Sequence, residues 1–121
     1  MPEIILGRVG GPDKSAGRRV LVDRLWPRGV SRERADWQEW LKDVAPSTEL
    51  RRWYGHEPGR RAEFERRYRQ ELADEQHAQA IARLVHLLEE GPLVLLTQTR
   101  DVEGSQLPTL RDFLLVRRTV G

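Results

Sequence analysis

The sequence contains no cysteine and only two lysines, and aromatic residues make up 7% of its 121 residues. The absence of cysteine excludes disulfides, thiol nucleophiles, thiolate metal sites and iron–sulfur clusters, and it fits a cytoplasmic protein. No apolar run approaches the roughly 20 residues that a membrane span requires. The segment from Met1 to Leu6 lacks a basic region ahead of a long apolar stretch, so we expect no secretory signal. A chain of this length predicts one domain, residues 1–121, with one core.

Positive and negative charges are nearly balanced in number, but the basic residues are almost all arginines. Lysine and arginine together number 21 against 19 acidic residues, and because only Lys14 and Lys42 are lysines, 19 of the bases are arginines. A formal net charge of +2 is a weak footprint for nucleic-acid binding. The arginines between residues 60 and 69 alternate with glutamates, which is typical of a solvated helix face. We therefore expect nucleic acid to be an unlikely partner.

Short apolar runs alternate along the chain with helical patterns. Strands are predicted over residues 3–9, 19–25 and 93–97, the last buried on both faces because its apolar run is continuous. Gly10 to Asp13 is predicted to break regular structure after the first strand. Three- and four-residue spacing of apolar residues predicts helices over 36–44, 48–54, 58–72, 81–88 and 108–117, with a break over 74–79. The expected fold class is therefore α/β, a single small domain with a short, mostly parallel sheet flanked by helices.

Polar residues gather after two of these strands, where the carboxyl ends of a parallel sheet place binding sites. Asp23, Arg24 and Arg28 surround a stiff Trp26-Pro27 pair after the second strand. Guanidinium groups bind phosphate or carboxylate with paired hydrogen bonds, so Arg24 and Arg28 are candidate ligand-binding residues. Two interpretations of Asp23 stay open, a catalytic base or metal ligand and a structural partner of Arg24. Trp26 is a candidate for ligand stacking, but a core position is the favoured interpretation.

The second polar segment and a lone histidine complete the candidate site. Arg100 and Asp101 follow the third strand and could bind a ligand or form only a local ion pair. If the two strands are parallel neighbours, both polar segments emerge side by side. His56 follows a predicted helix end at Gly55 and is a candidate for proton transfer or for a helix-terminal role. No spacing indicates a metal site, and the sequence names no cofactor.

Two long motifs carry a family resemblance. Residues 19–29 (RVLVDRLWPRG) and 40–56 (WLKDVAPSTELRRWYGH), continued by Phe64 and Tyr68, resemble domain-of-unknown-function family 488 (DUF488), in its short YeaO-like branch. The resemblance covers about Arg8 to Leu114 and implies a small bacterial or archaeal cytoplasmic α/β domain without an assigned reaction. The family pattern maps onto Asp23, Arg24, Trp26, Pro27, Arg28, Ser47, Trp53, Gly55 and His56.

The resemblance has one departure, near the end of the chain. Relatives of this branch usually follow the Arg-Asp pair after the last strand with Glu-Glu-His-Asn, whereas this chain has Val102-Glu103-Gly104-Ser105. If the His-Asn pair performs chemistry in other members, that chemistry is altered or lost here.

Two functional hypotheses lead. The first is a small domain, which could be an enzyme, that binds a phosphate- or carboxylate-bearing ligand. It predicts one concave pocket that holds Asp23, Arg24, Arg28, His56 and Arg100. The second is a protein-interaction or regulatory module without chemistry. Because a small sheet has edges to cover, a homodimer is plausible in that case.

Overall fold

The structure, a computed structural model, describes residues 3–11 and 17–120, with side chains as far as residue 117. Part of the predicted break at Gly10 to Asp13 lies outside these residues. The described residues form one four-stranded sheet in the order β1-β4-β2-β3. Its strands are β1 (Ile4–Arg8), β2 (Arg18–Leu21), β3 (Glu39–Trp40) and β4 (Leu93–Thr97). Every neighbouring pair is parallel, with Leu6 and Val20 both in register with Leu95.

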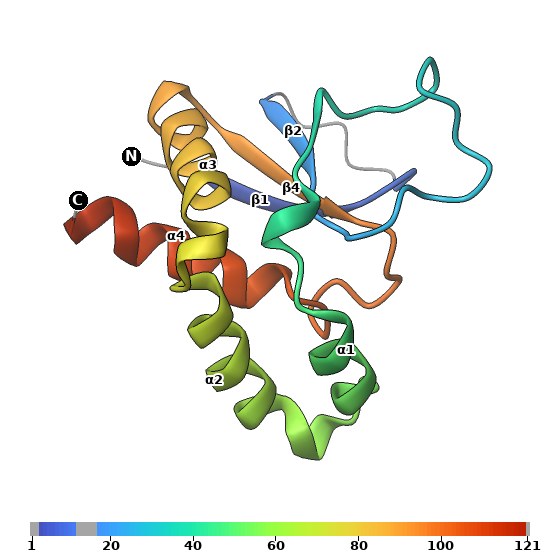
Figure 1. Cartoon of the computed structure of the whole chain (residues 1–121). Helices are drawn as coiled ribbons and strands as arrows, with labels where there is room; N and C mark the ends of the chain where they lie inside the picture. Colours follow the sequence, from blue (N-terminus) through green and yellow to red (C-terminus); the bar gives the residue numbers. More distant parts are fainter. Residues whose placement is uncertain (1–2, 12–16, 121) are drawn as a thin grey trace.

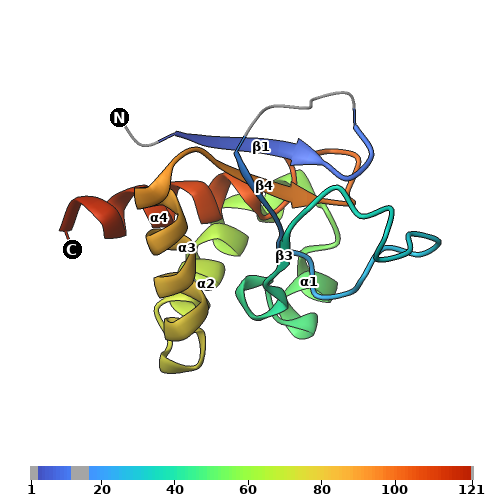
Figure 2. The same cartoon turned by 90° about the horizontal axis from the view of Figure 1, so that it is seen from above.

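Four α-helices of the described chain cover the sheet from one side (Figures 1 and 2). They are α1 (Thr48–Tyr54), α2 (Arg61–Leu72), α3 (Ala78–Glu90) and α4 (Leu107–Val120). Short 3-10 helices precede three of them, at Lys42–Val44, Pro58–Arg60 and Glu75–His77. The α/β class and the parallel sheet predicted from the sequence are therefore confirmed. Within the described residues no helix is long and apolar enough to cross a membrane.

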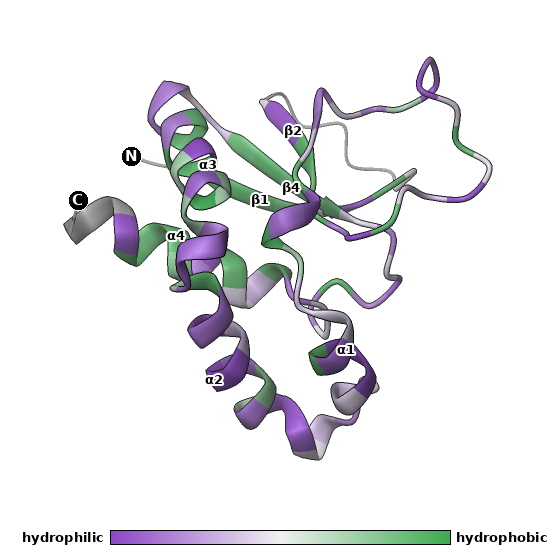
Figure 3. Ribbon diagram, viewed as in Figure 1, coloured by the Kyte–Doolittle hydropathy of each residue, from purple (hydrophilic) through white to green (hydrophobic). Residues whose placement is uncertain are grey.

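The alternation of side chains along β4 divides the core into two clusters, one on each face of the sheet. Leu93 and Leu95 point toward the helices, where they join the larger cluster. Val94 and Leu96 point the other way and pack with Leu21 and Trp37 in a smaller cluster. All five residues of β4 are buried, as its continuous apolar run predicts. Figure 3 shows the hydrophobic colouring along β4, in contrast to the hydrophilic α2.

The predicted helix over residues 36–44 is wrong. Glu39 and Trp40 instead form the edge strand β3, in register with Val20 and Leu21 of β2. The apolar side chains do not share one helical face: Trp37 joins the smaller cluster, while Val44 joins the larger one across the sheet. Strand pairing and burial on two faces have overridden the helical spacing. Asp36, at the start of the predicted helix, binds the guanidinium of Arg19 at 3.2 Å.

The other elements follow the prediction with shifted ends. The second strand ends at Leu21 rather than at residue 25, which leaves Asp23 and Arg24 free to bond through their side chains. The helical region after Pro58 is interrupted at Glu75–His77, inside the predicted break. The last helix begins at Leu107, so Pro108 stands in its first turn, where a missing backbone N–H costs no hydrogen bond.

Candidate functional site

The carboxyl ends of β2 and β4 lie side by side, as predicted, and Asp23 joins them. The Thr97 hydroxyl donates to Oδ1 of Asp23 at 2.7 Å, and the Gln98 backbone N–H donates to Oδ2 at 2.8 Å. The side-chain amide of Gln106, just before α4, donates to Oδ1 at 3.0 Å. The Asp23 residue is only 9% exposed. Its carboxylate therefore ties two strands and the start of α4 together.

Arg24 does not pair with Asp23, although the sequence suggested that partnership. Its guanidinium donates to the backbone carbonyls of Ala45 at 3.1 Å and Pro46 at 3.3 Å. These carbonyls belong to the segment that leads into α1. Arg24 thus holds the approach to α1 against the end of β2.

Trp26 lies in the smaller core cluster, as one of its two interpretations predicted. Its ring centroid lies 4.9 Å from that of Trp37 and 5.5 Å from that of Trp40, and its indole N–H donates to the Val30 carbonyl at 2.6 Å. Two residues further along the same loop, Arg28 is exposed and forms no hydrogen bond or ion pair with any described residue. The loop is therefore anchored by Trp26 and presents Arg28 to solvent.

Arg100 and Asp101 do not form an ion pair with each other in the described structure. The Asp101 carboxylate accepts the Gly104 backbone N–H at 3.1 Å, which closes a turn ahead of α4. Arg100 is exposed.

The helix α1 is fixed at both of its ends. Ser47 caps its start by accepting the Leu50 N–H at 3.1 Å, and the Ser47 N–H and hydroxyl both donate to the Glu71 carboxylate, at 2.8 and 2.6 Å. Gly55 ends the helix in the left-handed conformation at φ 51°. His56 follows at φ 57°, exposed, with its ring centroid 5.6 Å from that of Tyr54. The predicted helix end at Gly55 is therefore confirmed.

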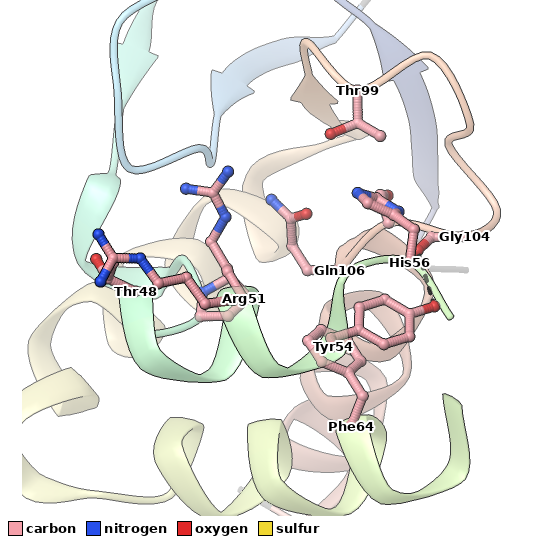
Figure 4. A pocket seen from close by; sticks show the side chains of 11 residues that line it. Thr48, Arg51, Tyr54, His56, Phe64, Thr99, Gly104 and Gln106 are labelled. Carbon is pink, nitrogen blue, oxygen red and sulfur yellow. Dashed lines mark hydrogen bonds between the residues drawn. The ribbon is translucent and has the colours of Figure 1, made fainter. Parts of the chain in front are cut away.

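A cleft of about 290 Å³ lies between α1 and the segment that connects β4 to α4 (Figure 4). Tyr54 and Phe64, stacked at 4.2 Å, contribute an aromatic wall. Arg51, Arg52 and His56 contribute nitrogen-bearing side chains to its lining. Neither arginine side chain forms a hydrogen bond or ion pair within the described part of the chain. The remaining lining residues are Pro46, Thr48, Thr99, Gly104, Ser105 and Gln106.

The candidate residues from the sequence do not meet in one pocket. Asp23 and Arg24 line a separate recess of about 50 Å³, which shares Arg51, Thr99 and Gln106 with the cleft. His56 lines the cleft, whereas Arg28 lines neither space.

Arg61 holds the far wall of the cleft. Its Nη1 donates to the carbonyls of Gly104 at 3.0 Å and Ser105 at 2.9 Å, and to the Tyr54 hydroxyl at 3.2 Å. The Tyr54 hydroxyl in turn donates to the Gly104 carbonyl at 3.2 Å. Two turns further along the same face of α2, Tyr68 donates to the Val44 carbonyl at 2.5 Å, and burial raises the pKa of this phenol well above its usual value. The helix α2 thereby fixes both the cleft wall and the approach to α1.

The departure from the family pattern falls in this wall. Gly104 and Ser105, where the family resemblance led us to expect His-Asn, both line the cleft. A Cβ atom on residue 104 would lie 2.3 Å from Oδ2 of Asp101, so a histidine there would require that carboxylate to move. The cleft wall at this point therefore consists of Gly104 and Ser105 rather than the imidazole and amide side chains of that pattern.

Sequence reasoning missed Arg51, Arg52 and Gln106 as cleft residues. The two arginines sit in a helical pattern that also describes a solvated face, and Gln106 carries no motif of its own. The one sequence feature that pointed to this part of the chain was Gly104-Ser105, because it departs from the His-Asn that the family resemblance led us to expect. Among residues 3–11 and 17–117, no group of three histidine, aspartate or glutamate side chains could hold a metal ion.

The fold and the cleft define a small parallel α/β domain with a cleft beyond the carboxyl ends of its strands. A family model described as the inactive DUF488-N3 subclade matches residues 3–119, and the chain belongs to this family.

Relatives from three organisms agree with this assignment. The uncharacterised protein Mb3100c of Mycobacterium bovis and the uncharacterised protein Rv3073c of Mycobacterium tuberculosis are each 43% identical over 102 residues, 84% of this chain and 84% of theirs. The uncharacterised protein YeaO of Escherichia coli is 39% identical over 102 residues, 84% of this chain and 87% of its own. No solved structure matches the chain.

Proposed function

We propose that this protein binds a small phosphate- or carboxylate-bearing molecule in the cleft without transforming it. The observation that carries the proposal is the pair Arg51 and Arg52, whose guanidinium groups line the cleft and are not neutralised by any residue in the described ranges. Guanidinium groups bind oxyanions with two parallel hydrogen bonds, which gives both affinity and orientation. The aromatic wall of Tyr54 and Phe64 suits an apolar or planar body on the same ligand.

The hydrogen bonds that the Asp23 carboxylate already accepts support binding without catalysis. A general base needs a free acceptor within hydrogen-bond reach of the proton that it removes. The Asp23 carboxylate already accepts three hydrogen bonds from Thr97, Gln98 and Gln106. The description of the family as an inactive subclade supports the same interpretation. The role of His56 in this proposal is to contribute an imidazole to the cleft rim rather than to shuttle protons.

The experiment is a calorimetric titration with phenyl phosphate and with inorganic phosphate, on wild type, Arg51→Met and Arg28→Met. Methionine keeps the length of the side chain and removes its charge. Hydrogen bonds to charged groups contribute about 1.5–3 kcal/mol, so Arg51→Met should weaken phenyl phosphate binding by about tenfold to a hundredfold. Arg28→Met is the matched control, because Arg28 is an exposed arginine that lies outside the cleft. It should bind like wild type.

Two results would count against the proposal. If neither phosphate probe binds, or if Arg28→Met loses affinity while Arg51→Met keeps it, the cleft is not an anion site. Phosphorus NMR of the incubated phenyl phosphate tests the second half of the claim. The probe should be recovered intact, and release of inorganic phosphate would make the protein an enzyme.

A further inference from the structure

The side-chain amide of Gln106 separates the cleft from the polar network around Asp23. Gln106 is only 9% exposed, and both donor positions of its amide nitrogen are used. Nε2 donates to Oδ1 of Asp23 at 3.0 Å and to the Val22 carbonyl at 3.3 Å. A glutamine amide has two donors at its nitrogen and only acceptor capacity at its oxygen. The nitrogen end is therefore fully bonded on the side away from the cleft.

The network leaves this amide only one orientation. The Thr97 hydroxyl oxygen accepts the Thr99 backbone N–H at 3.2 Å, so its own hydrogen is directed to Asp23. The Asp23 carboxylate has no hydrogen to offer, and neither does the Val22 carbonyl. Turning the Gln106 amide over would replace two hydrogen bonds with two contacts between acceptors. Asp23 and Val22 together therefore fix which end of the amide faces the ligand space.

As a result, the Gln106 Oε1 atom faces the cleft. Figure 4 shows the amide in the middle of the lining side chains, with its oxygen on the side of Thr99 and His56. No residue of the described chain donates a hydrogen bond to this oxygen. An acceptor that lines a cleft and has no protein donor must bond to water, so a ligand that displaces this water has to supply a donor, because leaving the acceptor unpaired costs free energy.

We infer that Gln106 is a specificity-determining residue that selects ligands carrying an N–H or O–H donor, and that Asp23 is the residue that positions it. The inference rests on the proposed function and narrows its ligand class. The oxyanion binds at Arg51 and Arg52, and the donor on the body of the same molecule binds Oε1 of Gln106. A ligand of the same shape that presents a methyl group at that point leaves Oε1 without a partner.

The test compares phenyl phosphates that carry a meta- or para-amino group with the corresponding meta- or para-methyl compounds, which match them in shape. One neutral hydrogen bond should make at least one amino compound bind about threefold to tenfold tighter than its methyl counterpart. Gln106→Met should abolish this preference, so that the amino and methyl compounds bind this variant with equal affinity. The unfolding midpoint of Gln106→Met confirms that the variant is folded.

A second measurement does not depend on any variant. In wild type, proton NMR of the Gln106 side-chain amide should show slow exchange of both hydrogens with water, since both are hydrogen-bonded. Equal affinities for amino and methyl compounds in wild type, or fast exchange of these hydrogens, would overturn the role of Gln106 and leave the anion site standing. Absence of binding by every phenyl phosphate would overturn the proposed function and this inference with it.

Discussion

Replacing Asp23 with alanine tests whether this residue is structural. The change removes the acceptor of three hydrogen bonds from a position that is 9% exposed. The Thr97 hydroxyl and the Gln106 amide are buried and would lose this partner, whereas Gln98 is exposed and its N–H can bond to water. A buried donor left without an acceptor costs about 1–3 kcal/mol, so the two together predict a loss of about 3 kcal/mol in the free energy of unfolding. That loss is a large part of the roughly 5–15 kcal/mol typical of a small domain.

The assay is equilibrium unfolding in urea, followed by tryptophan fluorescence at neutral pH. Asp43→Ala is the control, since Asp43 is exposed, and it should change the free energy of unfolding by less than about 0.5 kcal/mol. Thr97→Val and the double variant add a direct test of coupling, because two side chains in one network should give a non-additive sum. A loss below about 1 kcal/mol in Asp23→Ala would refute the argument, because unsatisfied buried donors cost at least that much. Asp23 would then be free for the ligand or for chemistry.

Three further predictions concern side chains of α2. Glu71→Ala removes both acceptors of Ser47 and should destabilise the fold by about 2 kcal/mol in urea unfolding, at about 1 kcal/mol for each hydrogen bond, whereas the exposed Glu75→Ala should not. Arg61→Met removes three hydrogen bonds from the cleft wall and should cost about 2–3 kcal/mol in the same assay, with unchanged stability as the contradicting result. Hydrogen bonds from Arg66 and then Arg67 lower the pKa of Glu63 from 4.5 to about 2, so their stabilisation is present above pH 4.5 and is lost as the pH falls toward 2. The unfolding midpoint of wild type should therefore fall more steeply over this range than that of Glu63→Gln, and parallel curves would contradict the assignment.

The sheet was predictable where a single signal dominated. The continuous apolar run of Leu93 to Thr97 identifies a central strand, and polar residues after two parallel strands meet as expected, in the contacts of Asp23 with Thr97 and Gln98. The edge strand β3 was not predictable from spacing. Its Trp40 sits at helical intervals from Trp37 and Val44, yet pairing with β2 and burial on two faces of the sheet decide its conformation. The local spacing of apolar residues therefore does not specify how a segment packs in the folded protein.

The cleft was less predictable than the fold. Arg51 and Arg52 are exposed, and the helical pattern of their segment does not reveal which loop lies opposite them across the cleft. The segment around Gly104 and Ser105 comes to face α1 through contacts with distant residues: Tyr54 donates to the Gly104 carbonyl, and Arg61 donates to the carbonyls of both residues. The sequence instead drew attention to Arg24, which bonds to the backbone before α1, and to Arg28, which is exposed in a loop. Arginine content alone cannot separate these roles.

The most direct test of the anion cleft is a backbone amide NMR titration of the wild-type protein with phenyl phosphate. The chemical shift changes should concentrate on the two sides of the cleft, at Arg51, Arg52 and His56 and over residues 104–106. Shifts confined to the loop that carries Arg28, or no saturable shifts at all, would contradict this expectation.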